Sequence, residues 1–212
     1  MMRGMEIQLM LSLLIDEDSI ANAASKAESM FPPSEHHLRL AFSIPGILFP
    51  EKAPAQLQHS QIQDTFAVNT IGPLLLTKHF TPFLPKKSTK PSPSPNVPAH
   101  AVWLNMAARI GSTSDNSLGG WYSYRASKAG VYSITKTLDL YLKMRSGSNA
   151  IAIAYHPGTV KTGLSKDFWG SVKEGQLLGA EEAVEKMLGV VGSVGVEGRG
   201  RCWDWKGKEI QP

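Results

Sequence analysis

A tyrosine and a lysine, Tyr124 and Lys128, stand four residues apart in the segment GWYSYRASKAGV, residues 120–131. Residues 122–144 contain no proline and carry leucine, isoleucine and valine at helical spacing, which predicts a helix. Four residues are about one helical turn, so the phenol and the ammonium project from the same face. A neighbouring ammonium favours the phenolate and lowers the pKa of tyrosine, which makes the phenol a better proton donor near neutral pH. The pair is a candidate for acid–base catalysis, although this spacing also occurs on exposed helix faces without a catalytic role.

The elements that must position this pair alternate between strand-like and helix-like segments. We predict strands at 8–15, 38–44, 101–106, 150–155 and 201–205, and helices at 20–30, 61–84, 122–144 and 181–191. Pro73 lies inside the second helix and is expected to bend it. Residues 86–98, KKSTKPSPSPNVP, are predicted to form an exposed loop. Strands separated by helices indicate an α/β fold, in which a parallel sheet has helices on both faces.

Composition argues against several classes of protein. The 212 residues are 42% hydrophobic and 19% charged, which is enough for a sizeable core, and we expect one domain over residues 1–212. The net charge is +4 with scattered basic residues, so we expect no nucleic-acid partner. No apolar run is long enough to cross a bilayer, so we expect no membrane partner. The single cysteine, Cys202, suits a reducing compartment, and we expect a cytoplasmic protein.

Several turn and loop segments follow the predicted strands directly. Gly46 follows the second strand, residues 107–114 follow the third, and residues 157–162 follow the fourth. In parallel sheets, ligands bind beyond the carboxyl ends of the strands. Because the helix of Tyr124 begins on the same side, we predict that Tyr124 and Lys128 face a ligand pocket there.

Three segments resemble the short-chain dehydrogenase/reductase family. YRASK at 124–128 matches its Tyr-x-x-x-Lys signature, FAVNTIGPLLLTKHF at 66–80 resembles its asparagine helix, and HPGTVKTGLS at 156–165 resembles its Pro-Gly segment. The tail GRCWDWKGKEI resembles a C-factor-like subgroup of small reductases. The resemblance implies a doubly wound, three-layer Rossmann-like fold that binds NAD(P), with NADP favoured and NAD as the alternative.

The resemblance also implies a role for individual residues. Tyr124 would be the general acid or base, and Lys128 would lower its pKa and bind the ribose hydroxyls of the cofactor. Asn69 would hold a water in a proton relay. Pro157, Gly158, Val160 and Thr162 would line the nicotinamide. Gly46, which remains from the family's Asn-Asn-Ala-Gly element, would also be a cofactor-binding residue. Each residue also has a plain structural alternative as a helix residue, a turn or a cap.

Two departures from the family pattern stand out. Ala107 and Ala108 occupy the place of a serine that would bind the substrate carbonyl, and Ser112, with Ser114 nearby, is the candidate replacement. The family's opening strand and glycine-rich TGxxxGxG turn have no counterpart in the sequence, so the fold is expected to be truncated at the N-terminus by about one βαβ unit.

Two functions from different classes follow. In the first, the chain is an NAD(P)-dependent oxidoreductase that acts on a small-molecule carbonyl or alcohol, and the two long helices resemble a family interface that would form a homodimer. In the second, it is a catalytically inactive relative that serves as an interaction or dimerisation module. The six histidines show no metal-ligand spacing, so no metal site is expected.

Overall fold

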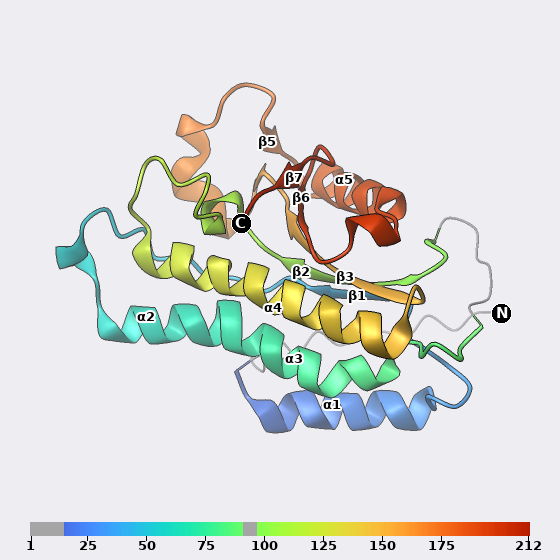
Figure 1. Cartoon of the computed structure of the whole chain (residues 1–212). Helices are drawn as coiled ribbons and strands as arrows, with labels where there is room; N and C mark the ends of the chain where they lie inside the picture. Colours follow the sequence, from blue (N-terminus) through green and yellow to red (C-terminus); the bar gives the residue numbers. More distant parts are fainter. Residues whose placement is uncertain (1–14, 91–96) are drawn as a thin grey trace.

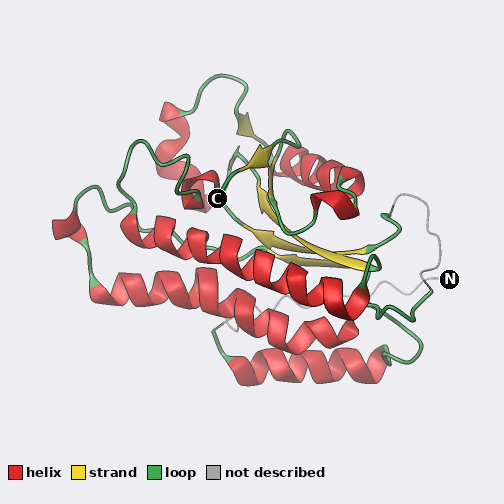
Figure 2. Ribbon diagram, in the orientation of Figure 1, coloured by secondary structure: helices red, strands yellow, loops and turns green. Residues whose placement is uncertain are grey.

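The computed structural model describes residues 15–90 and 97–212, and the sheet is built within these ranges (Figures 1 and 2). Four parallel strands and one antiparallel strand pair in the order β1-β2-β3-β6-β7. They are β1 (Leu40–Ser43), β2 (Ala101–Met106), β3 (Ala150–His156), β6 (Cys202–Asp204) and the antiparallel β7 (Glu209–Ile210). The predicted parallel sheet is confirmed. Of the predicted strand 8–15, all but Ile15 lies outside the described residues, and Ile15 is in a turn.

Helices cover both faces of the sheet, as predicted (Figure 1). The face that carries α4 (Tyr122–Ser146) also carries α2 (His59–Phe66) and α3 (Gly72–Phe80), and α1 (Glu17–Met30) packs outside α3. The opposite face carries α5 (Ala180–Ser193). A separate two-stranded sheet joins β4 (Thr159–Val160) to β5 (Leu177–Leu178), with a 3₁₀ segment, Gly163–Ser171, between them.

Alternation along β2 and β3 divides the core into two layers. Val102, Leu104, Ile151 and Ile153 pack towards α5, whereas Trp103 packs towards α4. This is the expected consequence of successive strand side chains pointing to opposite faces. Both central strands are almost fully buried, so they are covered on both sides, as strands of a parallel sheet in an α/β protein are.

The predicted helix 61–84 is interrupted rather than only bent. A π-helical segment, Ala67–Ile71, separates α2 from α3, and Pro73 lies in the first turn of α3. Proline has no N–H, so Pro73 cannot donate the α-helical bond to the carbonyl of Asn69, four residues before it. The widened turn accommodates this missing bond and lies at Asn69 itself, which fits the tendency of π segments to occur at functional positions.

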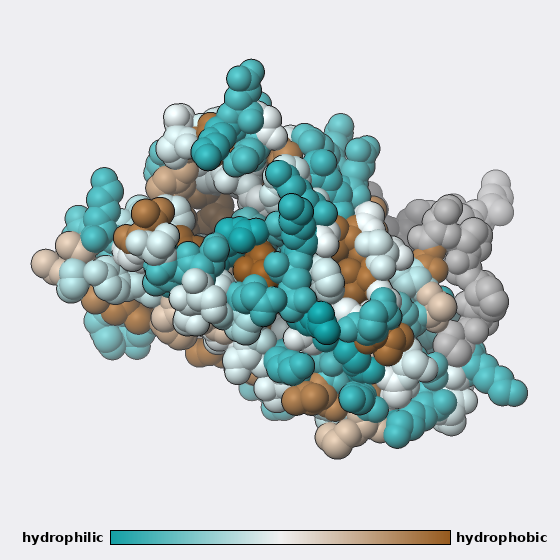
Figure 3. Space-filling view, turned by 45° about the horizontal axis from the view of Figure 1, so that its top comes forward, coloured by the Kyte–Doolittle hydropathy of each residue, from teal (hydrophilic) through white to brown (hydrophobic). Residues whose placement is uncertain are grey.

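The surface of the molecule is mixed in character. On the face shown in Figure 3, hydrophilic residues predominate and hydrophobic residues form small separate groups. In the parts of the chain that the structure describes, no helix combines the length and apolar character needed to cross a bilayer. Within the predicted loop 86–98, residues 91–96 lie outside the described residues, and Lys86, Lys87 and Lys90 are exposed.

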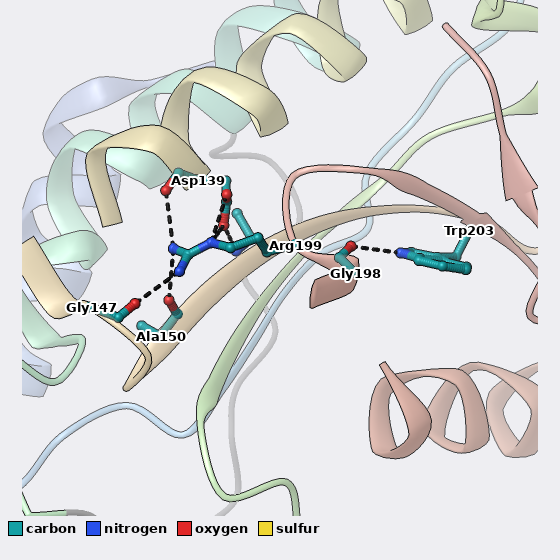
Figure 4. Close-up of polar contacts among 7 residues, drawn as sticks. Asp139, Gly147, Ala150, Gly198, Arg199 and Trp203 are labelled. Carbon is teal, nitrogen blue, oxygen red and sulfur yellow. Dashed lines mark hydrogen bonds and ion pairs between the residues drawn. The ribbon is translucent and has the colours of Figure 1, made fainter. Parts of the chain in front are cut away.

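A buried ion pair fixes α4 to the end of the chain (Figure 4). The Arg199 guanidinium donates to both carboxylate oxygens of Asp139 at 2.9 and 3.0 Å and to the carbonyl of Gly147 at 2.9 Å. Asp139 is 2% exposed, and its carboxylate also accepts the backbone N–H of Ala152 in β3 at 3.0 Å. Three elements, α4, β3 and the segment before β6, therefore meet at one carboxylate.

Replacing Arg199 by methionine would leave the Asp139 carboxylate buried without its cationic partner. We expect Arg199→Met to lower the free energy of unfolding by about 3–5 kcal/mol, measured by urea denaturation. Arg201→Met is the matched control, because the Arg201 side chain is 48% exposed and pairs with Glu209 at the surface. Its cost should be about 1 kcal/mol or less. Equal losses in the two variants would contradict this account, whereas adding Asp139→Asn to Arg199→Met should recover part of the loss.

Candidate active site

Tyr124 and Lys128 lie one turn apart near the start of α4 and both line the same cavity. They are 7% and 2% exposed, so neither belongs to a solvated helix face. The Lys128 ammonium donates to the carbonyl of Met106, at the end of β2, at 2.8 Å, and it lies 5.9 Å from the centre of the Tyr124 ring. The predicted juxtaposition of phenol and ammonium is therefore present.

Burial, rather than their mutual interaction, dominates the titration of the two groups. Desolvation raises the pKa of Tyr124 to about 12 and lowers the pKa of Lys128 to about 8. The sequence-based expectation that Lys128 lowers the pKa of Tyr124 is therefore not met in the chain alone. A buried phenol with this pKa keeps its proton at pH 7 and can donate it in a hydrogen bond.

Asn69 connects three parts of the site from behind the cavity wall. Its side-chain oxygen accepts the N–H of Ile47 at 2.8 Å, and its amide donates to the carbonyl of Ile47 at 2.9 Å and to the Ser127 hydroxyl at 3.0 Å. Asn69 is fully buried and does not line the cavity. It bonds a loop 22 residues away rather than its own backbone, so it holds the loop after β1 against α4.

Gly46 lies where this loop passes the lysine. A Cβ atom at Gly46 would stand 3.5 Å from the Lys128 ammonium nitrogen and 3.6 Å from the Asn69 side-chain oxygen. A side chain extending beyond that Cβ would occupy the space beside both groups. Glycine therefore leaves the ammonium accessible from the cavity, which Gly46 also lines.

The cavity has a volume of about 830 Å³ and lies at the carboxyl ends of the parallel strands, as predicted. Gly158 has φ of +75°, and a Cβ there would lie 2.9 Å from the indole of Trp205, so this turn requires glycine. The cavity brings together most of the predicted site residues: Gly46, Tyr124, Lys128, Pro157, Gly158, Val160 and Thr162.

The structure does not place Ser112 with this group. Ser112 is 1% exposed, its hydroxyl donates to the carbonyl of Gln211 at 2.5 Å, and it accepts the N–H of Asp115 at 3.1 Å. Neither Ser112 nor Ser114 lines the cavity, whereas Ala107 and Ala108 do. The cavity wall directly after β2 therefore presents methyl groups where the family pattern has a hydroxyl.

His156 and Trp121 are among the cavity residues to which the sequence reasoning assigned no role. His156 lines the cavity, its Nδ1 is buried without a partner, and burial lowers its pKa to about 4, so its imidazole is neutral at pH 7. Trp121 also lines the cavity and contacts the ring of Phe168 with centroids 4.7 Å apart. The sequence feature that could have pointed to His156 is its position immediately before Pro157–Gly158. Trp121 gave no signal beyond its closeness to Tyr124 in the sequence.

No metal cluster accompanies these groups. Among residues 15–90 and 97–212, no three histidine, cysteine, aspartate or glutamate side chains are grouped so that they could hold a metal ion. Two carboxylates near the cavity form ion pairs with an arginine instead. The Arg109 guanidinium pairs with Asp204 at 2.9 Å and with Asp115 at 3.6 Å.

Comparison with known proteins agrees with this fold. No family model matches the chain. C-signal from Myxococcus xanthus is 28% identical over 158 residues, which are 74% of this chain and 82% of that protein. The 1-hydroxy-2-glutathionyl-2-methyl-3-butene dehydrogenase from Rhodococcus sp. (strain AD45) is 27% identical over 174 residues, 82% of this chain and 68% of the relative.

Solved structures share the same architecture. The NADPH-bound carbonyl reductase from chicken fatty liver is 25% identical with a TM-score of 0.77, over 94% of this chain and 75% of that one. The carbonyl reductase Sniffer of D. melanogaster is 22% identical with a TM-score of 0.79 over the same shares. The fold is thus a Rossmann-like α/β fold with a Tyr-x-x-x-Lys pair at its ligand-binding edge. The homologues and structural neighbours of the chain are members of the short-chain dehydrogenase/reductase family, and its similarity to C-signal supports the C-factor-like subgroup.

The burial of Lys128 should cost stability. Its ammonium has no carboxylate partner within the described residues, and its pKa falls from 10.5 to about 8. At pH 7 the folded chain therefore carries a desolvated charge, while the unfolded chain carries a solvated one. We expect Lys128→Met to raise the free energy of unfolding by about 1–2 kcal/mol, since removing the charge outweighs the lost bond to Met106.

The pH dependence of this gain checks its cause. Between about pH 8 and 10.5 the unfolded chain still holds the proton that the folded chain has released, so the penalty fades as pH rises through this range. The gain from Lys128→Met, measured by denaturant unfolding at several pH values, should shrink accordingly. Lys143→Met, at an exposed position on α4, is the control and should change little. A loss of stability in Lys128→Met at pH 7 would refute the argument.

Proposed function

We propose that this chain is an NAD(P)-dependent oxidoreductase that interconverts a carbonyl compound and its alcohol. The observation that carries the proposal is the burial of Tyr124 and Lys128 side by side on the wall of a cavity of about 830 Å³, which the turn at Pro157 and Gly158 also lines. The NADPH-bound carbonyl reductase supports NADP as the cofactor, with NAD as the alternative.

The described residues fit the nicotinamide end of such a cofactor. Lys128 is accessible beside Gly46, where its ammonium can donate to ribose hydroxyls in addition to Met106. Pro157, Gly158, Val160 and Thr162 would line the ring from the end of β3, and Gly158 brings bare backbone to the cavity surface. The bound nicotinamide would supply or accept the hydride.

The residues of this chain would handle the proton. Tyr124 keeps its proton at pH 7, so its hydroxyl can donate a hydrogen bond to a carbonyl oxygen and then the proton itself as the alcohol forms. The phenolate left behind would be buried, and Lys128, which is largely protonated at pH 7, is the nearby cation that would stabilise it. Asn69 would contribute by holding Ile47, the neighbour of Gly46, and Ser127 in place around this pair.

Cofactor binding is the first test. The thermal midpoint of unfolding should rise by about 5–10 °C when NADPH or NADH reaches about one hundred times its dissociation constant, because the ligand binds only the folded chain. Lys128→Met should abolish most of the rise, whereas Lys143→Met should keep it. Tyr124→Phe should also keep the rise but lower kcat for carbonyl reduction at least about a hundredfold. If Tyr124→Phe retained full activity, the assigned proton donor would be wrong.

The alternative is a non-catalytic module that pairs with another copy of the chain. Ala107 and Ala108, which leave the cavity wall after β2 without a hydroxyl, favour this alternative. So do exposed apolar side chains on α4, where Leu140 is 51%, Tyr141 46% and Met144 70% exposed. Such a group of apolar residues on one helix is typical of an interaction surface.

The homodimer can be tested separately from catalysis. If α4 forms its interface, Leu140→Glu combined with Met144→Glu should convert a dimer to a monomer in analytical ultracentrifugation. Leu188→Glu, on α5 at 47% exposure, should leave the dimer intact. A chain that is monomeric at all concentrations would rule out the homodimer. A folded dimer whose midpoint does not respond to either cofactor would favour the module over the enzyme.

A further inference from the structure

Three aromatic rings form a continuous group on one wall of the cavity. Trp121 lies 4.7 Å from Phe168 and 6.1 Å from Tyr124, measured between ring centroids, and the second pair is arranged edge to face at 72°. All three residues line the cavity. The rings come from two segments, since Tyr124 and Trp121 belong to the start of α4 and Phe168 to the 3₁₀ segment Gly163–Ser171. The group therefore connects the proton donor to the outer part of the cavity.

The backbone at Trp121 is held in a conformation that tryptophan seldom adopts. Its φ and ψ are 51° and 47°, in the left-handed region, and it is the only non-glycine residue with positive φ in the described parts of the chain. For an L-residue this costs about 1–2 kcal/mol. The N–H of Trp121 donates to the carbonyl of Glu51 at 2.5 Å, and the buried Glu51 carboxylate accepts from the Ser123 hydroxyl. Glu51 therefore holds the chain both at the strained residue and two residues later, at Ser123.

Strain of this kind persists where the surrounding structure imposes it, and it clusters at ligand sites. Here it places an indole, rather than a helix-capping side chain, at the N-cap of the catalytic helix, where the structure shows no side-chain cap. Leu118, 91% exposed, lies nearby on the cavity wall. A ligand that covered Leu118 and the indole would remove apolar surface from water.

We propose that the cavity accepts a carbonyl compound whose carbonyl carbon bears a flat aromatic ring, and that Trp121 and Phe168 hold this ring beside Tyr124. This inference rests on the proposed function. A carbonyl attached directly to a ring leaves no spacer, so the ring lies close to the phenol when the carbonyl oxygen accepts its hydrogen bond. Two aromatic faces set at 51° to each other offer stacked and edge-to-face contacts to a third ring.

The test compares two ketones of nearly equal size, acetophenone and cyclohexyl methyl ketone, with NADPH as the reductant. Their intrinsic reactivities differ, but that difference is the same for every variant and cancels when the ratio of their kcat/KM values is compared. Aromatic pairing contributes beyond area burial, so this ratio should fall about three- to tenfold in Trp121→Leu and in Phe168→Leu. It should be unchanged in Trp169→Leu, because Trp169 lies in the same segment, bonds Ser165 at 2.8 Å and does not line the cavity.

Phe168→Leu keeps the proposal falsifiable if Trp121→Leu fails to fold, because Phe168 has ordinary backbone angles. If the wild-type chain oxidises no NADPH with either ketone, the proposed function fails, and binding then tests the inference alone. Dissociation constants for the two ketones, measured by ligand-observed NMR, should favour acetophenone in the wild-type chain and lose that preference in Phe168→Leu. A ratio of kcat/KM or of dissociation constants that is equal in the wild-type chain and Phe168→Leu would overturn the inference.

Discussion

The ion pair between Asp139 and Arg199 is the contact on which the arrangement of the site depends. Asp139 lies eleven residues after Lys128 on α4, and its carboxylate also accepts a bond from β3, the strand that leads into Pro157 and Gly158. Arg199 precedes β6, whose last residue, Asp204, pairs with Arg109 at the cavity. One buried carboxylate thus fixes the axial position of α4 relative to the strands that supply the rest of the candidate site. A shift of α4 along its axis would move Tyr124 and Lys128 away from the turn they face.

The site itself combines features that favour function at the expense of stability. Lys128 is buried without an acidic partner, His156 is held neutral with an unpaired nitrogen, and Trp121 has a strained backbone. Each of these features lowers the stability of the folded chain, so a core selected only for stability would not contain it. All three line one cavity, whereas the two layers of the core around β2 and β3 consist of ordinary apolar packing. The concentration of such departures in one place is itself an indication of a functional site.

Sequence reasoning succeeded where a local pattern determines the outcome. The helix of Tyr124 and Lys128 follows from the spacing of apolar residues, and the bounds of β2 follow from a buried apolar run. The convergence of Gly46 and residues 157–162 follows from the geometry of parallel strands. Sequence reasoning failed where a contact depends on residues far apart in the chain. The hydroxyl of Ser112 turns to Gln211, which is 99 residues away, and spacing from Tyr124 carries no information about that partner. The short strands β4, β5 and β7 have too few residues to produce a periodic signal.

The π-helical segment around Asn69 makes part of the site sensitive to chain length as well as to side-chain identity. A π turn contains one residue more than an α turn, so one residue removed between 67 and 71 would convert the wide turn to an ordinary one and change the directions of the side chains within this segment. The sequence on either side would still form helices, yet Asn69 could no longer face both Ile47 and Ser127. A single-codon deletion here would therefore break the contacts of Asn69 even though Asn69, Ile47 and Ser127 were all retained.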